Sequence, residues 1–176
     1  MQRWEDNRHQ AGQPTPFHPS NARNGVLEVR DARGGHVRDY QRDIFDNMVA
    51  GNQIRVRGIC DSACAEILNY APNIRTPNNP NGTIDISDAT FRVHQASTNY
   101  GPKSLEETRR ILSLYPEDAL RRGRVPSAEE IGRGYFPVYS RDIIRALDQQ
   151  HTGGQPQQQQ EPAPRRRGLF GRNRRD

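Results

Sequence analysis

The sequence predicts an α/β protein with a single domain, in which crossover helices join the strands of a parallel sheet. Three observations support this fold class. Between residues 25 and 70, a strand-like segment is followed by a helix-like segment twice in succession, the order typical of parallel strands with crossover connections. Turns of small residues follow both strands, at 34–35 and 62–65, and in parallel sheets ligands bind at the carboxyl ends of the strands. Apolar residues are concentrated in 25–150, which favours one core.

Both ends of the chain are expected to be disordered. Residues 1–24 contain Gln, Asn, Arg, His and Pro without apolar periodicity, and residues 151–176 join a Gln- and Pro-rich run to an Arg-rich end. Such segments bury too little apolar surface to offset the entropy lost on ordering. The predicted organisation is a disordered segment over 1–24, a folded domain over 25–150 and a disordered tail over 151–176.

The first half of the domain predicts two strand–turn–helix units. Residues 25–30 mix apolar and polar side chains at strand spacing, and residues 37–50 carry apolar side chains at helical spacing. Residues 54–58 alternate Ile and Val with Arg and predict the second strand. The turn around Ser62 then leads into a helix that ends near residue 70.

The second half predicts two further strands and a series of helices. Residues 72–82, rich in Pro and Asn, form a loop, and residues 83–86 and 90–94 form short strands. His94 therefore closes a strand and points beyond its end. Helical segments follow, beginning near residues 103, 116, 127 and 142. The third of these opens with Ser-Ala-Glu-Glu, a capping box.

Residues at the carboxyl ends of the predicted strands together suit acyl-transfer chemistry. Such chemistry needs a nucleophile, a base within hydrogen-bond reach and donors for a developing oxyanion. Ser62 supplies a hydroxyl and His94 an imidazole, while the amide of Ala63 and one from Gly34 or Gly35 supply the donors. Each residue type also has an ordinary role, since a Ser often caps a helix, a lone His is often structural and Gly-Gly often only makes a turn. The shared sheet edge favours the catalytic interpretation.

Several segments resemble the proteolytic subunit of Clp protease and its relatives. They are Val-Leu-Glu-Val at 26–29, the paired glycines, Ile-Phe-Asp-Asn-Met at 44–48, Arg-Gly-Ile-Cys-Asp-Ser-Ala-Cys-Ala at 57–65 and Phe-Arg-Val-His-Gln-Ala at 91–96. The segment 127–135, Ser-Ala-Glu-Glu-Ile-Gly-Arg-Gly-Tyr, is similar to the closing segment of the family. The likeness is greatest to bacterial Clp-like proteins, often exported, that carry Gly-x-Cys-x-Ser-Ala-Cys.

This resemblance implies the Clp/crotonase fold and a serine peptidase that cleaves a peptide or protein substrate without a cofactor or metal ion. The site residues that it implies are Ser62 as nucleophile, His94 as general base, and Gly34 or Gly35 with Ala63 as the oxyanion hole. It further implies a homo-oligomer and, where an ATP-driven unfoldase is used, one that is a separate protein.

The acid that would orient the base is the weakest part of the resemblance. Ungapped alignment places Gly123 where the family has its catalytic Asp. The nearest substitute is Asp118, in a Pro-Glu-Asp segment similar to the Pro-x-Asp of the exported relatives, and Glu117 and Asp142 come next. Loss of an orienting acid costs about 10⁴-fold in turnover, so the alternative is a catalytically weak or inactive binding or assembly module on the same fold. The segment 73–82 is longer than its counterpart in the family and is in a position to cover the site.

The positive charge of the chain belongs mainly to its tail. The formal net charge is +5, and residues 161–176 hold six Arg against Glu161 and Asp176, a balance of +4. The remaining +1 argues against a basic nucleic-acid-binding face on the domain. The tail is expected to be a solvated segment or to contact an acidic partner or nucleic acid.

The cysteines and the apolar segments indicate the compartment. Cys60 and Cys64 are spaced so that they can meet around a turn, but we expect them to be small buried apolar residues. No second Cys/His pair at ligand spacing completes a zinc site. No segment is long and apolar enough for a membrane span, and the first residues lack the apolar run of a secretory signal. We expect a cytoplasmic protein.

Overall fold

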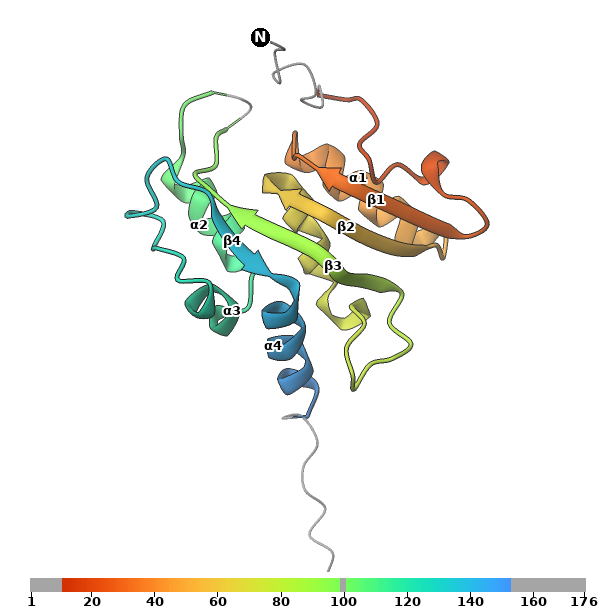
Figure 1. Ribbon diagram of the computed structural model, residues 1–176. Helices are drawn as coiled ribbons and strands as arrows, with labels where there is room; N and C mark the ends of the chain where they lie inside the picture. Colours follow the sequence, from red (N-terminus) through yellow and green to blue (C-terminus); the bar gives the residue numbers. More distant parts are fainter. Residues whose placement is uncertain (1–10, 99–100, 153–176) are drawn as a thin grey trace, which may run out of the picture.

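The computed structural model describes residues 11–98 and 101–152. Its centre is a four-stranded sheet in the order β1 (Val26–Ala32), β2 (Gln53–Asp61), β3 (Ile84–Val93) and β4 (Phe136–Tyr139) (Figure 1). The first three strands are parallel, and β4 runs antiparallel to β3. The domain is therefore α/β with a mixed sheet, whereas the sequence predicts a wholly parallel one.

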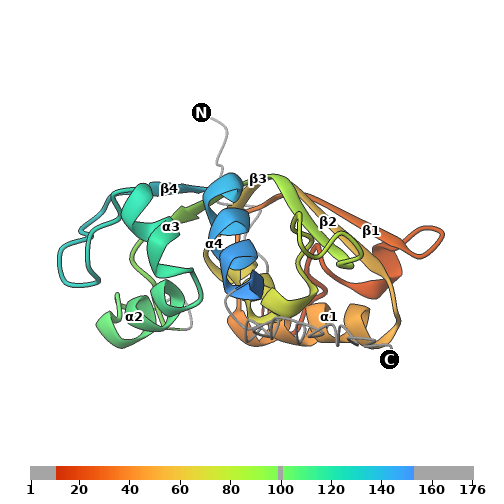
Figure 2. The same ribbon diagram turned by 90° about the horizontal axis from the view of Figure 1, so that it is seen from below.

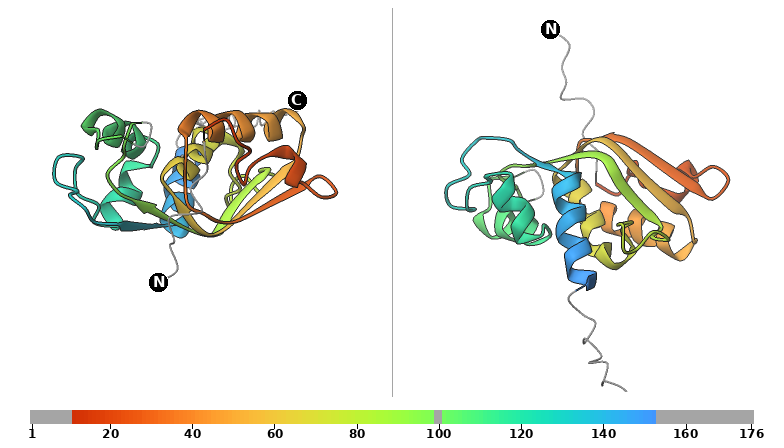
Figure 3. Two further views of the ribbon diagram at one scale, coloured as in Figure 1. Left: turned by 90° about the horizontal axis from the view of Figure 1, so that it is seen from above. Right: turned by 60° about the horizontal axis from the view of Figure 1, so that its bottom comes forward.

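The helices α1 (Val37–Val49), η2 (Ser62–Asn73), α2 (Leu105–Ser113), α3 (Glu117–Arg122) and α4 (Ser140–Thr152) all lie on one face of the sheet (Figure 2, Figure 3). The strands alternate accordingly, with Leu27 and Val29 buried and Glu28 and Arg30 exposed on β1. This alternation is typical of a sheet with one covered and one solvated face. Among the described residues, none of the helices combines the length and the apolar character needed to cross a membrane.

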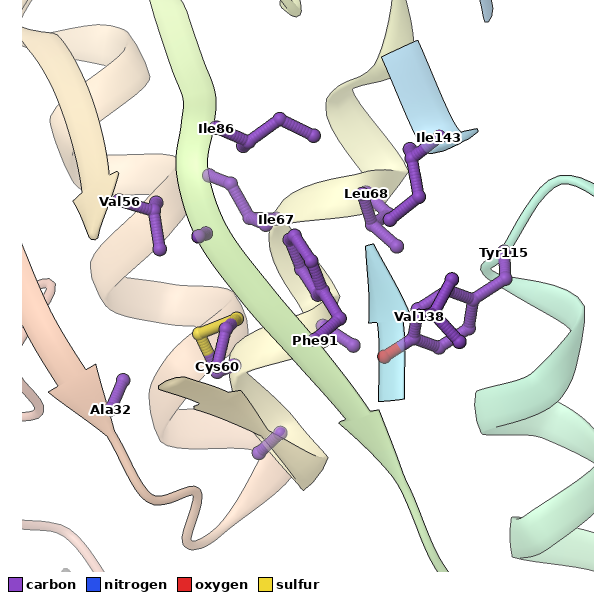
Figure 4. Close-up of a cluster of buried hydrophobic side chains, with 14 of the residues drawn as sticks. Ala32, Val56, Cys60, Ile67, Leu68, Ile86, Phe91, Tyr115, Val138 and Ile143 are labelled. Carbon is purple, nitrogen blue, oxygen red and sulfur yellow. A yellow bond between two sulfur atoms is a disulfide. The ribbon is translucent and has the colours of Figure 1, made fainter. Parts of the chain in front are cut away.

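The core fills the space between the sheet and the helices (Figure 4). Phe91 of β3 is fully buried and packs edge-on against Tyr115, with ring centroids 5.9 Å apart. Ile67 and Leu68 of η2, together with Ile143 of α4, are buried in the same cluster. Each such side chain contributes about 1.5–3 kcal/mol when fully buried, so β3 is anchored along the length that leads to His94.

Irregular pairing between β1 and β2 shapes the edge where these strands end. The register shifts between Arg30 and Ala32, and Asp31 lies at this shift with a positive φ of 50°. The Asp31 carboxylate accepts a hydrogen bond from the amide of Ile59 at 2.9 Å. Bulges of this kind bend a strand and redirect the residues that follow it, here the turn that contains Gly34.

Several elements differ from those that the sequence predicts. The two strands predicted at 83–86 and 90–94 are one continuous strand, because pairing with β2 resumes at Asp88, opposite Arg57, after a shift in the register. The helix predicted from residue 127 is a series of turns. The last helix begins at Ser140, slightly before its predicted start near residue 142, and extends to Thr152.

Part of the segment 1–24, predicted to be disordered, belongs to the folded domain. Phe17 is fully buried and lies edge-on to Tyr40, with centroids 5.8 Å apart. Asp43 on α1 accepts a hydrogen bond from the amide of Thr15 at 2.7 Å, and Asn47 donates to the carbonyl of Phe17. One aromatic ring and these polar contacts hold residues 11–24, including the short helix η1 (Pro19–Asn21), against α1. Residues 1–10 and most of the predicted tail lie outside the described residues.

Cys60 and Cys64 form a disulfide (Figure 4), which corrects the prediction of two free buried thiols. Cys60 lies near the end of β2 and Cys64 in the first turn of η2. The tight turn between them brings their Cα atoms to 5.3 Å, a separation typical of disulfides. The bond therefore closes a small ring around Ser62.

Candidate active site

A cleft of about 580 Å³ opens at the carboxyl ends of β1, β2 and β3. The residues that follow these strands line it, among them Gly34 and Gly35 after β1, Ser62 after β2 and His94 after β3. Its volume lies within the usual range of ligand sites, about 300–1,000 Å³. The structure therefore brings four of the predicted site residues to one cleft.

Ser62 has the backbone conformation of an exposed nucleophile rather than of a helix cap. Its φ is +52°, a value that non-glycine residues adopt rarely and at an energetic cost. The N-cap of η2 is Asp61, and no side chain caps this helix. Within the described residues Ser62 Oγ makes no hydrogen bond, including none to His94. The side chain is partly exposed in the cleft, as expected for a strained strand-to-helix turn that presents a hydroxyl.

Gly34 packs directly against the turn at 60–64 that carries Ser62. Its φ is +88°, and a Cβ at this position would lie 2.8 Å from Ser62 Cβ and 3.4 Å from the amide nitrogen of Ala63. Only glycine fits such a close approach. Ala63 itself is fully buried and does not line the cleft, so only its main chain can contribute to the site.

A hydrogen bond orients the amide of Gly35. The hydroxyl of Tyr40, buried in the core, donates to the carbonyl of Gly34 at 3.2 Å. Because the peptide unit is planar and trans, the N–H of Gly35 points opposite to that carbonyl and hence away from Tyr40. Ala63 lies in the first turn of η2, where amides have no partner inside the helix. These two amides are the candidate donors to an oxyanion near Ser62.

The imidazole of His94 is oriented by the main chain. Its Nδ1–H donates to the carbonyl of Gln95 at 2.8 Å, and because a carbonyl only accepts, Nε2 is left as the acceptor nitrogen. Burial lowers the pKa of His94 below its ordinary value of 6.5, and Lys103 and Arg92 act in the same direction, against the Gln95 carbonyl and Asp61, which raise it. The neutral form that a general base needs is therefore favoured.

A chain of contacts that the sequence does not predict connects the turn at Ser62 to His94. Asp61, next to Ser62, is buried and forms a two-point ion pair with Arg92, with Nε and Oδ1 2.7 Å apart. The guanidinium of Arg92 lies 5.0 Å from the ring centroid of Tyr135, and this ring stacks on His94 with centroids 4.6 Å apart. In the sheet register Asp61 is opposite Arg92, and this pairing of opposite charges is the one signal from which the ion pair can be inferred. Nothing in the local sequence marks Tyr135.

The structure does not bring Asp118 to His94. Asp118 lies on α3, where its carboxylate accepts from Arg121 at 3.1 Å and Arg122 at 3.0 Å. It does not line the cleft, and neither do Glu117 and Asp142. The hydrogen bond from Arg122 lowers the Asp118 pKa. Ion pairs at i, i+3 and i, i+4 on a helix surface account fully for this carboxylate.

The segment 73–82 also lies apart from the cleft, contrary to the prediction that it covers the site. None of its residues lines the cleft. Ile74 pairs with Ile84 at the start of β3, and the amide of Asn78 donates to Asp148 of α4 at 2.8 Å. The segment is therefore held at the amino end of β3, whereas His94 follows its carboxyl end (Figure 1).

Comparisons of the chain with protein-family models, with curated proteins and with solved structures each found no match. Among residues 11–98 and 101–152, no group of three or more His, Cys, Asp or Glu side chains is placed to hold a metal ion. The cleft itself offers a hydroxyl in a strained turn, an imidazole whose lowered pKa favours its neutral form, and the candidate amides of Gly35 and Ala63.

Proposed function

We propose that the chain is a serine hydrolase that cleaves peptide bonds, with chemistry related to that of the Clp peptidases it resembles. The observation that carries this proposal is the backbone of Ser62. A positive φ at this serine, which has no capping role, lies within the ring closed by the Cys60–Cys64 disulfide and in the same cleft as His94, whose lowered pKa favours the neutral imidazole. Strain of this kind clusters at functional sites.

The proposed reaction proceeds through an acyl-enzyme. Ser62 Oγ attacks the peptide carbonyl while Nε2 of His94 takes its proton, and the oxyanion accepts hydrogen bonds from the amides of Gly35 and Ala63. The imidazolium then gives its proton to the leaving amine. Water, activated by the same imidazole, hydrolyses the ester. The Gln95 carbonyl and the nearby Asp61 charge favour the imidazolium that forms along the way.

A fluorophosphonate probe tests this proposal, because it forms a covalent bond only with an activated serine. We expect the wild type to be labelled, and we expect Ser62→Ala to abolish labelling while leaving the melting temperature close to that of the wild type. Ser97→Ala is the matched control, since Ser97 lines the same cleft and its removal should leave labelling intact. Labelling that persists in Ser62→Ala would exclude Ser62 as the nucleophile.

One observation favours a second candidate, a catalytically weak or inactive binding or assembly module. The Nδ1 of His94 donates to a carbonyl of the main chain, where a serine protease has a carboxylate. A carbonyl fixes the tautomer but carries no full charge to stabilise the imidazolium. This candidate predicts no labelling of the wild type and capture of an acidic partner or nucleic acid that requires residues 165–175, the Arg-rich tail.

The compartment is a further part of the proposal. The sequence predicts the cytoplasm, but disulfides persist mainly in oxidising compartments, and the Cys60–Cys64 bond therefore supports an oxidising one. An alkylating reagent added to the host cells blocks any free thiols of the protein before extraction, and the fraction of alkylated Cys60 and Cys64 is then measured. A low fraction indicates an oxidising compartment, and a high fraction indicates the cytoplasm. A homo-oligomer and a separate unfoldase remain proposals that rest on the resemblance to the Clp peptidases.

A further inference from the structure

Each acidic side chain that lines the candidate cleft is paired with an arginine. Asp61 is held by Arg92. Glu107 accepts from the Nε of Arg110 at 2.9 Å. Asp39 accepts from Arg42 at 3.1 Å. Arg42 also pairs with Asp43, and Arg110 also pairs with Glu66. Two carboxylates share each of these arginines, so one negative charge remains in each group.

Three cations in the same cleft are not neutralised in this way. Arg33, Arg38 and Lys103 line the cleft, and within the described residues none of them forms an ion pair. Lys103 donates only to the carbonyl of Gln95, at 3.3 Å. These three cations outnumber the two negative charges left by the shared arginines, so positive charge predominates among these side chains even though the folded domain as a whole is close to neutral.

The three cations lie on both sides of Ser62, two toward Gly34 and one toward His94. Arg33 immediately precedes Gly34, and Arg38 lies in the first turn of α1, so both are on the oxyanion side of Ser62. Lys103 lies on the base side, because it shares the Gln95 carbonyl with His94. Positive charge thus flanks the nucleophile on both sides.

We propose that this cleft selects peptides that carry Asp or Glu next to the bond to be cleaved, a specificity that rests on the proposed peptidase function. A carboxylate that enters the cleft meets guanidinium groups with the fork geometry that binds carboxylates at two points. Charge-assisted hydrogen bonds of this type contribute more than neutral ones. The uncharged side-chain amide of Asn or Gln has the same shape but gains no ionic contribution to binding.

A nucleic acid is a poorer fit to the same charges. A strand of nucleic acid needs an extended basic track that follows many phosphates, whereas the cations here surround one cleft and alternate with the paired acids Asp39 and Glu107. A short acidic peptide needs only the few cations that one cleft provides.

The test uses the full chain with Ser62→Ala, which binds substrate without cleaving it. Two pools of fluorescent octapeptides are compared by anisotropy; they differ only in that Asp and Glu in one pool are Asn and Gln in the other. We expect the acidic pool to bind about tenfold more tightly, with the preference shrinking as salt is raised. Equal affinity for the two pools, no binding of either, or tighter binding of a single-stranded oligonucleotide would overturn the inference.

Charge-removing variants locate the effect. Arg33→Gln, Arg38→Gln and Lys103→Gln, each added to Ser62→Ala, should reduce the preference for the acidic pool. Arg145→Gln is the matched control, because Arg145 is exposed on α4, forms no ion pair within the described residues and does not line the cleft. An equal loss in Arg145→Gln would show that the preference reflects overall charge and overturn the inference.

The peptidase proposal and the specificity inference fail separately. Labelling of the wild type by the fluorophosphonate, with no preference between the pools, would contradict the specificity alone. A preference for the acidic pool without labelling would support the anionic subsite and contradict the peptidase.

Discussion

The turn at 60–64, which carries the proposed nucleophile, is packed against buried structure except where Ser62 faces the cleft, whereas His94 is held by one main-chain carbonyl and one exposed ring. The turn is closed by the buried disulfide, flanked by Gly34 and continued by the fully buried Ala63. The ring that stacks on His94 belongs to Tyr135, which is 56% exposed. The two halves of the site thus differ in rigidity, and the base is the half on which variation in activity should depend.

The largest effect on activity should come from adding a side chain at Gly34, next to the more tightly packed turn at 60–64. We predict that Gly34→Ala lowers kcat/KM by about 10²–10³-fold, the loss typical of a damaged oxyanion hole, because the new methyl group would lie 2.8 Å from Ser62 Cβ. Steady-state kinetics on a fluorogenic peptide measure it. Gly51→Ala is the control: its φ is similarly positive at +72°, with nothing within 4 Å of the added group. Equal losses in the two variants would show that backbone strain alone is responsible.

Opening the ring around the nucleophile should have the next largest effect. Replacing both cysteines, Cys60→Ala with Cys64→Ala, should lower the free energy of unfolding by roughly 2 kcal/mol, since a five-residue ring restricts the unfolded chain only modestly. Chemical denaturation with and without a reducing agent measures this. The reducing agent should destabilise the wild type and leave the double variant unchanged. A double variant as stable as the oxidised wild type would contradict the role given to the disulfide.

Removing the Tyr135 ring that packs on His94 should have a smaller effect on catalysis. We predict that Tyr135→Ala lowers kcat/KM by about tenfold, because the imidazole loses the ring that restricts its orientation. Tyr135→Phe keeps the stacked ring and should restore most of the rate, which separates stacking from any role of the hydroxyl. If the Phe variant were as slow as the Ala variant, stacking would not be the cause.

The smallest effect concerns the acid limb of the pH profile. Because the pKa of His94 is lowered, kcat/KM should fall only below the pH at which an ordinary histidine protonates, 6.5. Lys103 contributes to that lowering, so Lys103→Gln should move the limb to higher pH, measured with a neutral substrate; Arg145→Gln should not. The unfolded state binds more protons than the folded state between the two pKa values, so the free energy of unfolding contributed by His94 falls as the pH drops through that window. An acid limb above pH 6.5 in the wild type would contradict the assignment of His94 as the base.

Local signals explain which parts of the fold could be predicted. The strands β1 and β2 and the helix α1 each carry their own periodicity, and the turns after the strands carry small residues. β4 has only four residues and includes Pro137, which normally argues against a strand. It forms because it is an edge strand that pairs with β3, and this pairing is a tertiary contact that no local pattern contains.

In the candidate site, too, the residues marked by a local pattern could be predicted and the tertiary contacts could not. Ser62, His94 and the paired glycines could be selected from their positions at predicted strand ends, and the cleft brings them together. The orienting group could not be selected, because a search for an acid cannot find the carbonyl of Gln95, which every residue type possesses. Whether Cys60 and Cys64 meet depends on the backbone angles of the turn between them, and their spacing alone does not determine these.

The short pairing of β4 has a consequence for how the site responds to warming. β4 contacts the sheet through four residue pairs, from Thr90 to Val93, immediately before His94. An edge strand of this length can detach in a local opening far less costly than global unfolding, and the segment that carries Tyr135 would move with it. The nucleophile, enclosed between β2 and η2, would keep its geometry meanwhile. We therefore expect activity to be lost at a lower temperature than the one at which the whole domain unfolds, through an opening that begins at the edge of the sheet.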